Sequence, residues 1–465
     1  MKITFLGAAR KVTGSCFHLS VNGLQVLVDC GMHQGLDSDA LNRKPFAFDP
    51  RAIDVVFLTH AHIDHTGLVP RLVREGFRGK IVTTAATAEL SRIMLADSAH
   101  IQEMDAQWMT RKNLRAGIEK AVEPLYTVED AIASIPFFEK RQYDETYALD
   151  HVIRYRFCDA GHILGSGTLE LWYRGDAKKK IIFSGDIGKK GNPIIQDPVH
   201  ADETDYVVVE STYGNRMHKG AEDSLEELAD AVRTTFKRGG NVYIPAFAVG
   251  RTQDLLYVFN KLVREGRLAS PLDVYVDSPL AEEATKVYAS HPELFDEETK
   301  RLMASKKGRT VRLRFTSSVQ ESMKLNQVSS GAVIMAGSGM CEGGRIRHHL
   351  KHNLWRPECS VVFVGYQAKG TLGRAIVDGA KDVWILGERV AVRSRVFTIG
   401  GFSAHADQKE LLEWLGLFKN KPEVFIVHGE ETSALEFEKQ VKAQLGLRTR
   451  VPEMGRALKF EAGKW

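Results

Sequence analysis

The stretch of sequence that decides the fold is HAHIDH, residues 60–65. It follows the apolar run 55–58, which predicts a buried strand, and it precedes a helical pattern over residues 68–73 that ends near Gly76. A loop between a strand end and a helix start is fixed in position and can direct alternate side chains into one cavity. We therefore expect a binding site where this strand ends.

The residue types in this stretch predict a metal site. His60 and His62 lie two residues apart, so both imidazoles can face one metal, and Asp64 and His65 can then face a second. Imidazole and carboxylate ligands without a thiolate suit zinc first, with manganese or iron as alternatives. The other interpretation is a chance cluster in a polar surface loop, but such a cluster is rare when 465 residues contain 16 histidines.

Further candidate ligands stand at the ends of other apolar segments. His162 lies in the glycine-rich segment 159–166 between two predicted strands, Asp186 follows the apolar run 181–184, and His428 follows the run 424–427. A lone histidine at a strand end is more often structural, but the shared position of these residues favours one common site.

These residues suffice for two metals. We assign His60, His62 and His162 to the first metal, assign Asp64, His65 and His428 to the second, and expect Asp186 to bridge both. Asp29, which follows the apolar run 26–28, is expected to orient a ligand or the bound water.

The order of predicted elements indicates a domain that is split in sequence. An Asn22-Gly23 turn predicts a hairpin near the N-terminus, strands alternate with helices up to residue 209, and from about residue 224 the pattern is that of a doubly wound parallel sheet. After residue 393 the pattern returns to strand, helix and strand. We expect an α/β protein whose first domain comprises residues 1–209 and 393–465, with a second α/β domain inserted at 210–392.

The composition excludes several classes of protein. No apolar run approaches the roughly 20 residues needed to cross a bilayer, and the N-terminus does not resemble a signal peptide. The five cysteines are scattered and never spaced as C-x-x-C, which favours a reducing, cytoplasmic location. The net charge of +4 is too small to indicate a nucleic-acid partner by itself.

The candidate residues resemble a known family. The order Asp29, HAHIDH, His162 and Asp186 resembles the four motifs of the metallo-β-lactamase superfamily. Glu210 in the segment 209–214, His405 in the segment 401–407, and His428 are similar to motifs A, B and C of its β-CASP subfamily of RNA-processing nucleases. The resemblance covers nearly the whole chain and implies a four-layered αββα sandwich, split in sequence by an inserted β-CASP domain.

The resemblance also implies an activity. A histidine at motif C is typical of the RNA-processing branch, so we expect hydrolysis of single-stranded RNA by two Zn²⁺ ions, with Mn²⁺ or Fe as alternatives. Asp64, His405, Glu210 and Asp29 are the expected catalytic residues. A hydroxide bridging the metals would attack the phosphate, His405 would protonate the leaving ribose oxygen, and Glu210 would orient His405. Internal cleavage, cleavage from a 5′ end and a homodimeric state all stay open.

The inserted domain is expected to close over the metals and hold the RNA backbone. The amides of Gly337, Ser338, Gly339 and Met340 could hold a phosphate, although a plain tight turn is an equal alternative. Arg251 and the segment 365–374 are further candidates. Basic residues gather in two groups, for which a solvated surface is the alternative: Lys306, Lys307, Arg309, Arg312 and Arg314, and Arg345, Arg347 and Lys351.

Three rival functions share parts of this pattern. A DNA nuclease of the same fold would use the same metal chemistry, and only His428 and the family grouping speak against it. A small-molecule hydrolase such as a lactamase or thioesterase does not need a long insertion between Glu210 and His405. A non-catalytic RNA-binding protein does not need every ligand position filled, as it is here.

Overall fold

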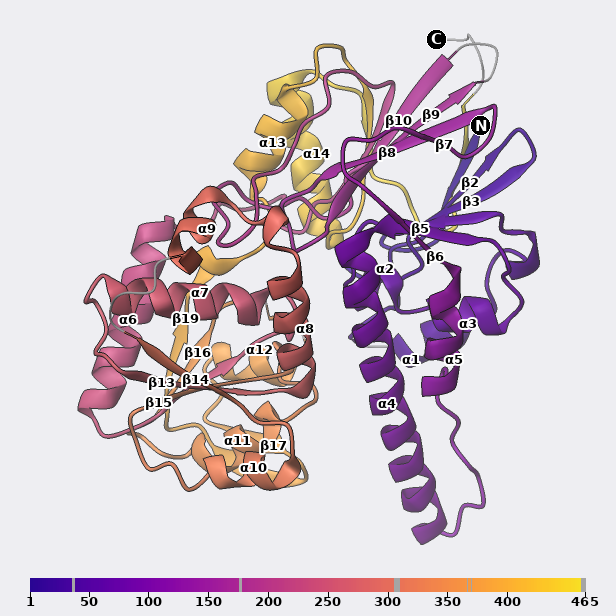
Figure 1. Cartoon of the computed structure of the whole chain (residues 1–465). Coiled ribbons are helices and arrows are strands. Elements are labelled where there is room, and N and C mark those ends of the chain that lie inside the picture. Colours follow the sequence, from indigo (N-terminus) through magenta and orange to yellow (C-terminus); the bar gives the residue numbers. More distant parts are fainter. Residues whose placement is uncertain (36–37, 175–177, 305–309, 366, 369, 461–465) are drawn as a thin grey trace. The chain divides into compact units, whose positions relative to one another are not determined.

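The computed structural model describes residues 1–35, 38–174, 178–304, 310–365, 367–368 and 370–460. The chain forms two compact units (Figure 1). Unit 1 comprises Met1–Asn192, Gln196–Met217 and His405–Trp465, and unit 2 comprises Pro193–Ile195 and His218–Ala404. A segment is thus inserted into a domain that is split in sequence. The domain boundaries expected from the sequence, at 209/210 and 392/393, stay a prediction.

The first sheet of unit 1 has seven strands. The Asn22-Gly23 turn predicted from the sequence joins β2 to β3, and both turn residues have positive φ, as a tight hairpin turn requires. In spatial order the strands are β22 (Ala457–Lys459), β1 (Lys2–Phe5), β2 (Phe17–Val21), β3 (Leu24–Val28), β4 (Val55–Phe57), β5 (Lys80–Thr84) and β6 (Phe138–Arg141).

The second sheet of unit 1 also has seven strands. β10, β11 and β20 are parallel neighbours, so their carboxyl ends meet at one edge of this sheet. In spatial order the strands are β21 (Thr449–Arg450), β20 (Glu423–Ile426), β11 (Tyr206–Val209), β10 (Lys178–Phe183), β9 (Gly167–Arg174), β8 (Ile153–Asp159) and β7 (Tyr147–Ala148).

The two sheets pack face to face, and helices cover their outer faces. Phe57 from the first sheet and Phe183 and Phe425 from the second are fully buried in the core between them. Burying one such side chain contributes about 2–3 kcal/mol. The helices of this unit are α1 (Ser38–Arg43), α2 (Ile63–Thr66), α3 (Val69–Arg74), α4 (Ala85–Arg115), α5 (Val128–Ser134), α13 (Gln408–Gly416) and α14 (Glu431–Leu445), with 3₁₀ turns η1 (Pro50–Ala52) and η2 (Ile135–Phe137).

The positions of these helices give the four layers. Leu72 of α3 and Leu95 of α4 pack on the outer face of the first sheet. Leu411 of α13 and Phe437 of α14 pack on the outer face of the second. The αββα sandwich predicted from the sequence is therefore confirmed.

Unit 2 is built on a six-stranded sheet in which all neighbouring strands are parallel. In spatial order the strands are β14 (Val311–Phe315), β13 (Leu272–Asp277), β15 (Ala332–Ala336), β12 (Val242–Pro245), β16 (Ser360–Phe363) and β19 (Arg395–Thr398), and a separate hairpin joins β17 (Asp382–Ile385) to β18 (Glu388–Ala391).

Helices cover both faces of this sheet. Leu228 of α6 and Phe259 of α7 are buried in the core on one face, and Leu350 of α11 and Ile376 of α12 are buried on the other. This is the predicted doubly wound arrangement. The helices are α6 (Ala221–Lys237), α7 (Arg251–Arg264), α8 (Pro279–Ser290), α9 (Glu297–Ala304), α10 (Val319–Leu325), α11 (Ile346–Asn353) and α12 (Leu372–Val377), with 3₁₀ turns η3 (Pro292–Leu294) and η4 (Gly400–Phe402).

None of the helices within the described ranges combines the length and the apolar character that crossing a membrane requires.

Candidate metal centre

The HAHIDH segment lies at the carboxyl end of β4, as predicted. Leu58 to Ala61 form the loop, His62 precedes the first turn of α2, and Asp64 and His65 lie in that turn. The loop is fixed from several sides, because the backbone of His65 accepts a hydrogen bond from the amide of Cys30 and that of Asp64 accepts one from Ser15. The three histidines and the aspartate are thereby held on one side of the loop.

The other candidates come to the same place from the second sheet. His162 lies in the loop between β8 and β9, Asp186 follows β10, Glu210 follows β11, and His428 follows β20. The parallel pairing of β10, β11 and β20 brings the last three together. His405 lies just before α13 and pairs with Gly188 in an isolated β-bridge.

Two groups of ligand atoms result. His60, His62, His162 and Asp186 form the first group, and Asp64, His65 and His428 form the second; within each group the atoms lie within 4.8 Å of one another. The structure thus brings together the residues that the sequence assigns to each metal, and their role as ligands stays a prediction. A third group has three members within the same distance of one another: Asp186, Glu210 and His428.

The first group has the spacing of a metal coordination shell. His60 Nε2 lies 3.1 Å from His62 Nδ1, His162 Nε2 lies 3.3 Å from the same atom, and His60 Nε2 lies 3.4 Å from Asp186 Oδ2. Ligands at ordinary zinc distances in a tetrahedron are separated by about 3.3 Å.

The second group is equally close. His65 Nε2 lies 3.1 Å from His428 Nε2, and His428 Nε2 lies 3.4 Å from Asp64 Oδ2. Asp186 also reaches this group, since its Oδ1 lies 3.4 Å from His65 Nε2. That oxygen is buried and accepts no hydrogen bond from the described residues. A buried carboxylate oxygen surrounded by ring nitrogens fits a bound cation.

The protonation states of the histidines agree with a bound cation at this place. Burial lowers the pKa of His60 to about 3 and also lowers the pKa of His62 and of His162. These three imidazoles are therefore neutral at pH 7 and can offer a lone pair to a metal. His65 differs: burial opposes its charge, but the carboxylates of Asp186 and Asp29 raise its pKa well above the usual value. A cation would take the place of that proton.

Asp29 lies beside His65, and its orienting role stays a prediction. Its Oδ2 lies 2.7 Å from His65 Nδ1, which leaves His65 Nε2 facing the second group. The carboxylate is held by the backbone amide and hydroxyl of Thr59, at 2.8 and 3.0 Å. The sequence prediction missed Thr59, whose only signal is its place directly before His60. It also missed Thr212, whose hydroxyl lies 3.2 Å from His428 Nδ1 and which belongs to the segment 209–214.

His405 and Glu210 form a pair beside the two groups. Nδ1 of His405 lies 3.1 Å from each oxygen of Glu210, and Glu210 also accepts a hydrogen bond from the amide of Ile187 at 2.7 Å. The His405 side chain is 20% exposed, whereas Glu210 is fully buried. Burial would lower the pKa of His405, but the charge of Glu210 raises it to about 9. His405 is therefore protonated near neutral pH and partly exposed to solvent.

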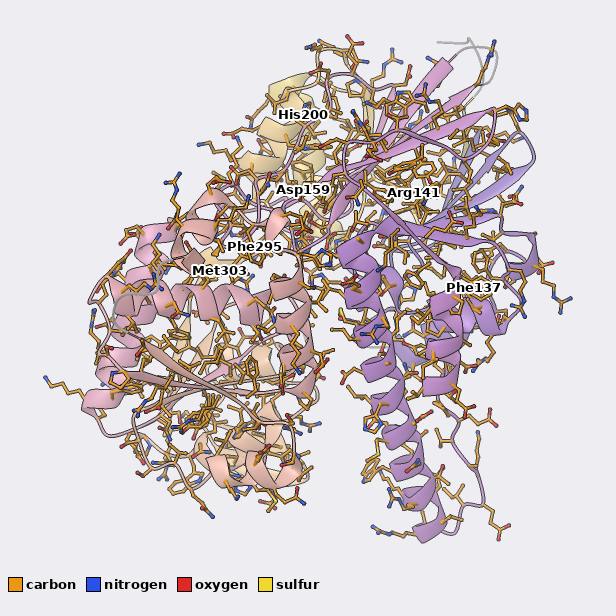
Figure 2. The ribbon with its side chains drawn as sticks, in the orientation of Figure 1. Phe137, Arg141, Asp159, His200, Phe295 and Met303 are labelled. Atoms are coloured by element: carbon orange, nitrogen blue, oxygen red, sulfur yellow. The ribbon has the colours of Figure 1, made fainter. Side chains whose placement is uncertain are left out.

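A partly buried carboxylate, that of Asp159, shapes the loop that carries His162. Asp159, labelled in Figure 2, ends β8, and its Oδ1 accepts a hydrogen bond from the amide of Gly161 at 2.8 Å. Burial raises its pKa to about 7. Because this loop is fixed by its own hydrogen bonds, His162 has a defined direction.

The residues predicted to contact RNA lie in unit 2. The glycine-rich segment 337–340 follows β15, and the amide of Ser338 donates to the carbonyl of Gly343. The guanidinium of Arg345 donates to Asp277 and to two backbone carbonyls. Arg251 pairs with Asp254 at 3.1 Å.

The other described basic residues that the sequence groups as candidate RNA contacts have partners within unit 2. Arg312 pairs with Asp273 at 2.7 Å, Arg314 donates to the Tyr275 hydroxyl, and Lys351 pairs with Glu388. Arg347 donates to the carbonyl of Glu342. Lys306, Lys307 and Arg309 lie outside the described residues, as do two positions of the segment 365–374. An RNA-binding role for any of these residues stays a prediction.

Three family models match the chain: the metallo-beta-lactamase superfamily over residues 11–140, the Beta-Casp domain over 252–376, and the Zn-dependent metallo-hydrolase RNA specificity domain over 389–452. Ribonuclease TTHA0252 of Thermus thermophilus is 38% identical over 94% of this chain and 95% of its own length. The chain belongs to the β-CASP family of the metallo-β-lactamase superfamily. The resemblance predicted from the motifs is thereby confirmed.

This β-CASP protein is similar to others along nearly its whole length. An RNase J-like protein of Methanocaldococcus jannaschii is 30% identical over 98% of this chain and 99% of its own. Transcription termination factor FttA of Methanosarcina mazei is 31% identical over 97% of this chain and 70% of its own. A solved structure of a protein of unknown function from Enterococcus faecalis matches with a TM-score of 0.54 at 12% identity, covering 98% and 99% of the two chains, and shows the shared fold alone.

Proposed function

We propose that this β-CASP protein is a ribonuclease that hydrolyses phosphodiester bonds of single-stranded RNA with two divalent metal ions. One observation carries the proposal: two groups of buried donor atoms share a single carboxylate, Asp186, at one edge of the sandwich. Their nitrogen and oxygen chemistry suits zinc first, and Mn²⁺ or Fe second.

The ligand roles follow from the two groups. His60, His62 and His162 would hold one ion, and Asp64, His65 and His428 the other, with Asp186 facing both. Bound in this way, the ions would supply Lewis-acid activation of water and charge neutralisation of the phosphate. Asp29 would keep His65 in the tautomer and orientation that a ligand needs.

His405 is the proposed general acid. Hydrolysis leaves negative charge on the departing ribose oxygen, and a histidine is a suitable proton donor near neutral pH. Glu210 faces Nδ1 and stabilises the charged ring, so the other ring nitrogen, Nε2, is the atom that would give its proton to the substrate. The partial exposure of the ring supports this role, because a donor must reach an RNA strand.

RNA is the proposed substrate for two reasons. The curated relatives with extensive similarity include proteins named as ribonuclease and RNase J-like. In addition, residues 389–452, which include His405 and His428, match a model described as an RNA specificity domain. Cleavage within the strand and stepwise cleavage from the 5′ end are both compatible with this site.

The test is cleavage of a 5′-labelled, 5′-monophosphorylated single-stranded RNA and its DNA counterpart, with Zn²⁺ or Mn²⁺ present. We expect the wild type to cut RNA. Asp186→Ala should abolish cleavage and metal binding together. His405→Ala should lower the rate by about 10²- to 10⁴-fold while the metal content stays unchanged. Product lengths separate internal cleavage from release of mononucleotides.

Matched controls are available on the same chain. Asp205→Ala and His291→Ala remove the same residue types at partly exposed ion pairs that include none of the proposed site residues, and both should behave as wild type. Intact RNA with the metal-loaded wild type would refute the proposal. Faster cleavage of DNA than of RNA would replace it with the DNA nuclease alternative.

A further inference from the structure

Helix α4 carries a row of apolar side chains that the rest of unit 1 leaves exposed. Leu90, Leu95 and Ala99, in the first half of the helix, are buried. Farther along, Ile101, Met104 and Trp108 have exposed fractions of 50%, 49% and 56%. Figures 1 and 2 show this second half of α4 extending beyond α3 and α5. We call Ile101, Met104 and Trp108 the α4 stripe.

The stripe occupies a single face of the helix. Residues spaced by three and by four lie on the same side, so the three side chains form one continuous row. The returning segment 118–127 covers a different face, where the amides of Val122 and Leu125 donate to Thr110 and Gln102. The ammonium of Lys112 lies 5.3 Å above the Trp108 ring at the end of the stripe. Exposed apolar rows of this kind mark protein-binding surfaces.

Charges on the same face are arranged with opposite signs at the two ends. Asp97 lies one turn before the stripe, and Arg111 and Arg115 lie on its continuation toward the end of the helix. Suppose that a second copy of α4 runs antiparallel to the first, with the stripes facing each other and the two helices crossing at the level of residue 106 along the helix. Asp97 then lies opposite the partner's Arg115, and Met104 lies opposite the partner's Trp108. Ile101 lies opposite the partner's Arg111, so the helix face is complementary to itself in apolar character at Met104 and Trp108 and in charge at its two ends.

We propose that α4 is the interface through which two copies of this chain associate, with their helices antiparallel about a two-fold axis that passes between Met104 and Trp108 on the stripe face. The contact from Asp97 to Arg115 spans about 27 Å of helix. The apolar stripe supplies the centre of the interface and the charged pairs its ends, as in other helix pairs. This proposal concerns assembly and does not depend on the proposed ribonuclease activity.

RNA is the other occupant to consider, because Trp108 lies among Arg111, Lys112 and Arg115. A surface that binds a nucleic acid backbone is expected to be basic along its length. Here Asp97 and Asp105 share the helix with two aliphatic side chains, Ile101 and Met104. The mixture favours a protein surface, and the symmetric arrangement of the charges favours a second copy of this chain.

The first test is the mass of the full-length protein by sedimentation velocity over a range of concentrations. We expect a dimer for the wild type and a monomer for the double variant Met104→Glu/Trp108→Glu. Trp384→Glu is the matched control, because Trp384 lies in the β17–β18 hairpin and is 69% exposed. It should stay dimeric. Circular dichroism of all three proteins shows whether they are folded.

The second test distinguishes the antiparallel pairing from any other. Arg115→Asp alone, and Asp97→Arg alone, should each raise the dimer dissociation constant by about tenfold or more, because the two-fold axis repeats the repulsion. The double variant D97R/R115D should restore dimerisation. Arg115 is exposed, so its variant tests the pairing without disturbing the packing of α4.

Several results would overturn the proposal. A wild type that is monomeric at every concentration would do so, and so would a dimer that withstands the stripe variants or is not restored by the double charge reversal. If the stripe variants lost RNA binding while the mass of the protein did not change, α4 would be an RNA contact instead.

Discussion

At the scale of single residues, Asp29 shows how a buried carboxylate outside the proposed ligand set can determine the direction of a ligand. Each of its oxygens is already engaged: Oδ1 accepts the amide of Thr59, and Oδ2 faces both the hydroxyl of Thr59 and Nδ1 of His65. An isosteric amide offers only one oxygen, so it would place an NH₂ group against one of these donors.

We therefore predict that Asp29→Asn lowers the metal affinity by about 10- to 100-fold, the range typical for partners that orient a ligand. Competition with a chromophoric chelator measures this affinity directly. Asp205→Asn, a change of the same type at a partly exposed ion pair, should leave it unchanged. An unaltered affinity in Asp29→Asn would show that Thr59 and the fold hold His65 without the carboxylate.

How far single residues can be predicted from sequence depends on where their partners come from. The meeting of the HAHIDH residues, Asp186 and His428 at one place was predictable because each follows an apolar strand. Glu210 and His405 came only from the family resemblance, since their contact joins residues far apart in the chain and leaves no local pattern. Arg345, which is predicted to contact RNA, also donates through its guanidinium to Asp277, a partner that the sequence does not reveal. Its contact with RNA stays a prediction.

At the scale of elements, the site depends on loops that approach one another very closely. Gly188 lies where three segments meet: its amide donates to Ala160, it pairs with His405, and the neighbouring carbonyl of Ile187 accepts the amide of Ala406. A Cβ atom at this position would lie 1.7 Å from the carbonyl oxygen of Gly161. Glycine is thus required for the loop of His162 to lie beside His405.

We predict that Gly188→Ala displaces the His162 loop and lowers the RNA cleavage rate by at least about tenfold, because small displacements at a site have large kinetic effects. Cleavage rate and metal content, measured on the same preparation, test this. Gly416→Ala, where the added methyl group makes only an ordinary contact at 3.5 Å with the side chain of Leu445, is the control and should keep full activity. Full activity in Gly188→Ala would mean that the loops of His162 and His405 can move apart enough to accommodate the methyl group while the site stays intact.

Unit 2 has its own buried junction between elements. Asp277, at the end of β13, accepts hydrogen bonds from Arg345 at 2.7 Å and from Ser322 at 2.6 Å, and it also contacts Thr316. His349 of α11 lies 2.7 Å from its second oxygen. Burial alone would raise the pKa of Asp277, but these partners lower it below its usual value. The ionised carboxylate therefore holds α10 and α11 at the carboxyl ends of β13 and β14.

Asp277→Asn should lower the free energy of unfolding by about 3 kcal/mol at pH 7, as removal of one partner of a buried pair does. A carboxylate with a lowered pKa contributes stability above its unfolded-state pKa of about 4, and this contribution is lost as the pH falls further. Denaturant titrations of both proteins should accordingly show a difference that is full at pH 7 and shrinks below about pH 4. A difference that does not change with pH would assign the loss to packing.

In both units the buried central strands were easier to predict from the sequence than the strands at the edges of the sheets. Short apolar runs such as β12 and β20 are visible in the sequence because both of their faces are buried. Edge strands such as β14, whose pattern is dominated by Arg312 and Arg314, were interpreted as a basic surface. The arginines contact side chains of β13, and only the assembled sheet supplies those partners.

At the scale of the whole molecule, the two units differ in what stabilises them. Each has its own core: the faces of two sheets in unit 1, and both faces of one parallel sheet in unit 2. All of the proposed metal ligands belong to unit 1. Metal binding is therefore linked to the folding of unit 1 alone.

We predict that calorimetry resolves two unfolding transitions and that chelation lowers only one of them. At a free metal concentration of about 1,000 times Kd, bound metal stabilises the folded unit by about 4 kcal/mol, and a chelator removes this contribution. Asp277→Asn should shift the other transition, which identifies it as that of unit 2. The sandwich core of unit 1 should keep its circular dichroism after chelation, since it is large and does not require metal to fold. If chelation shifted both transitions together, the units would unfold as one cooperative body, and the separate cores would not act independently.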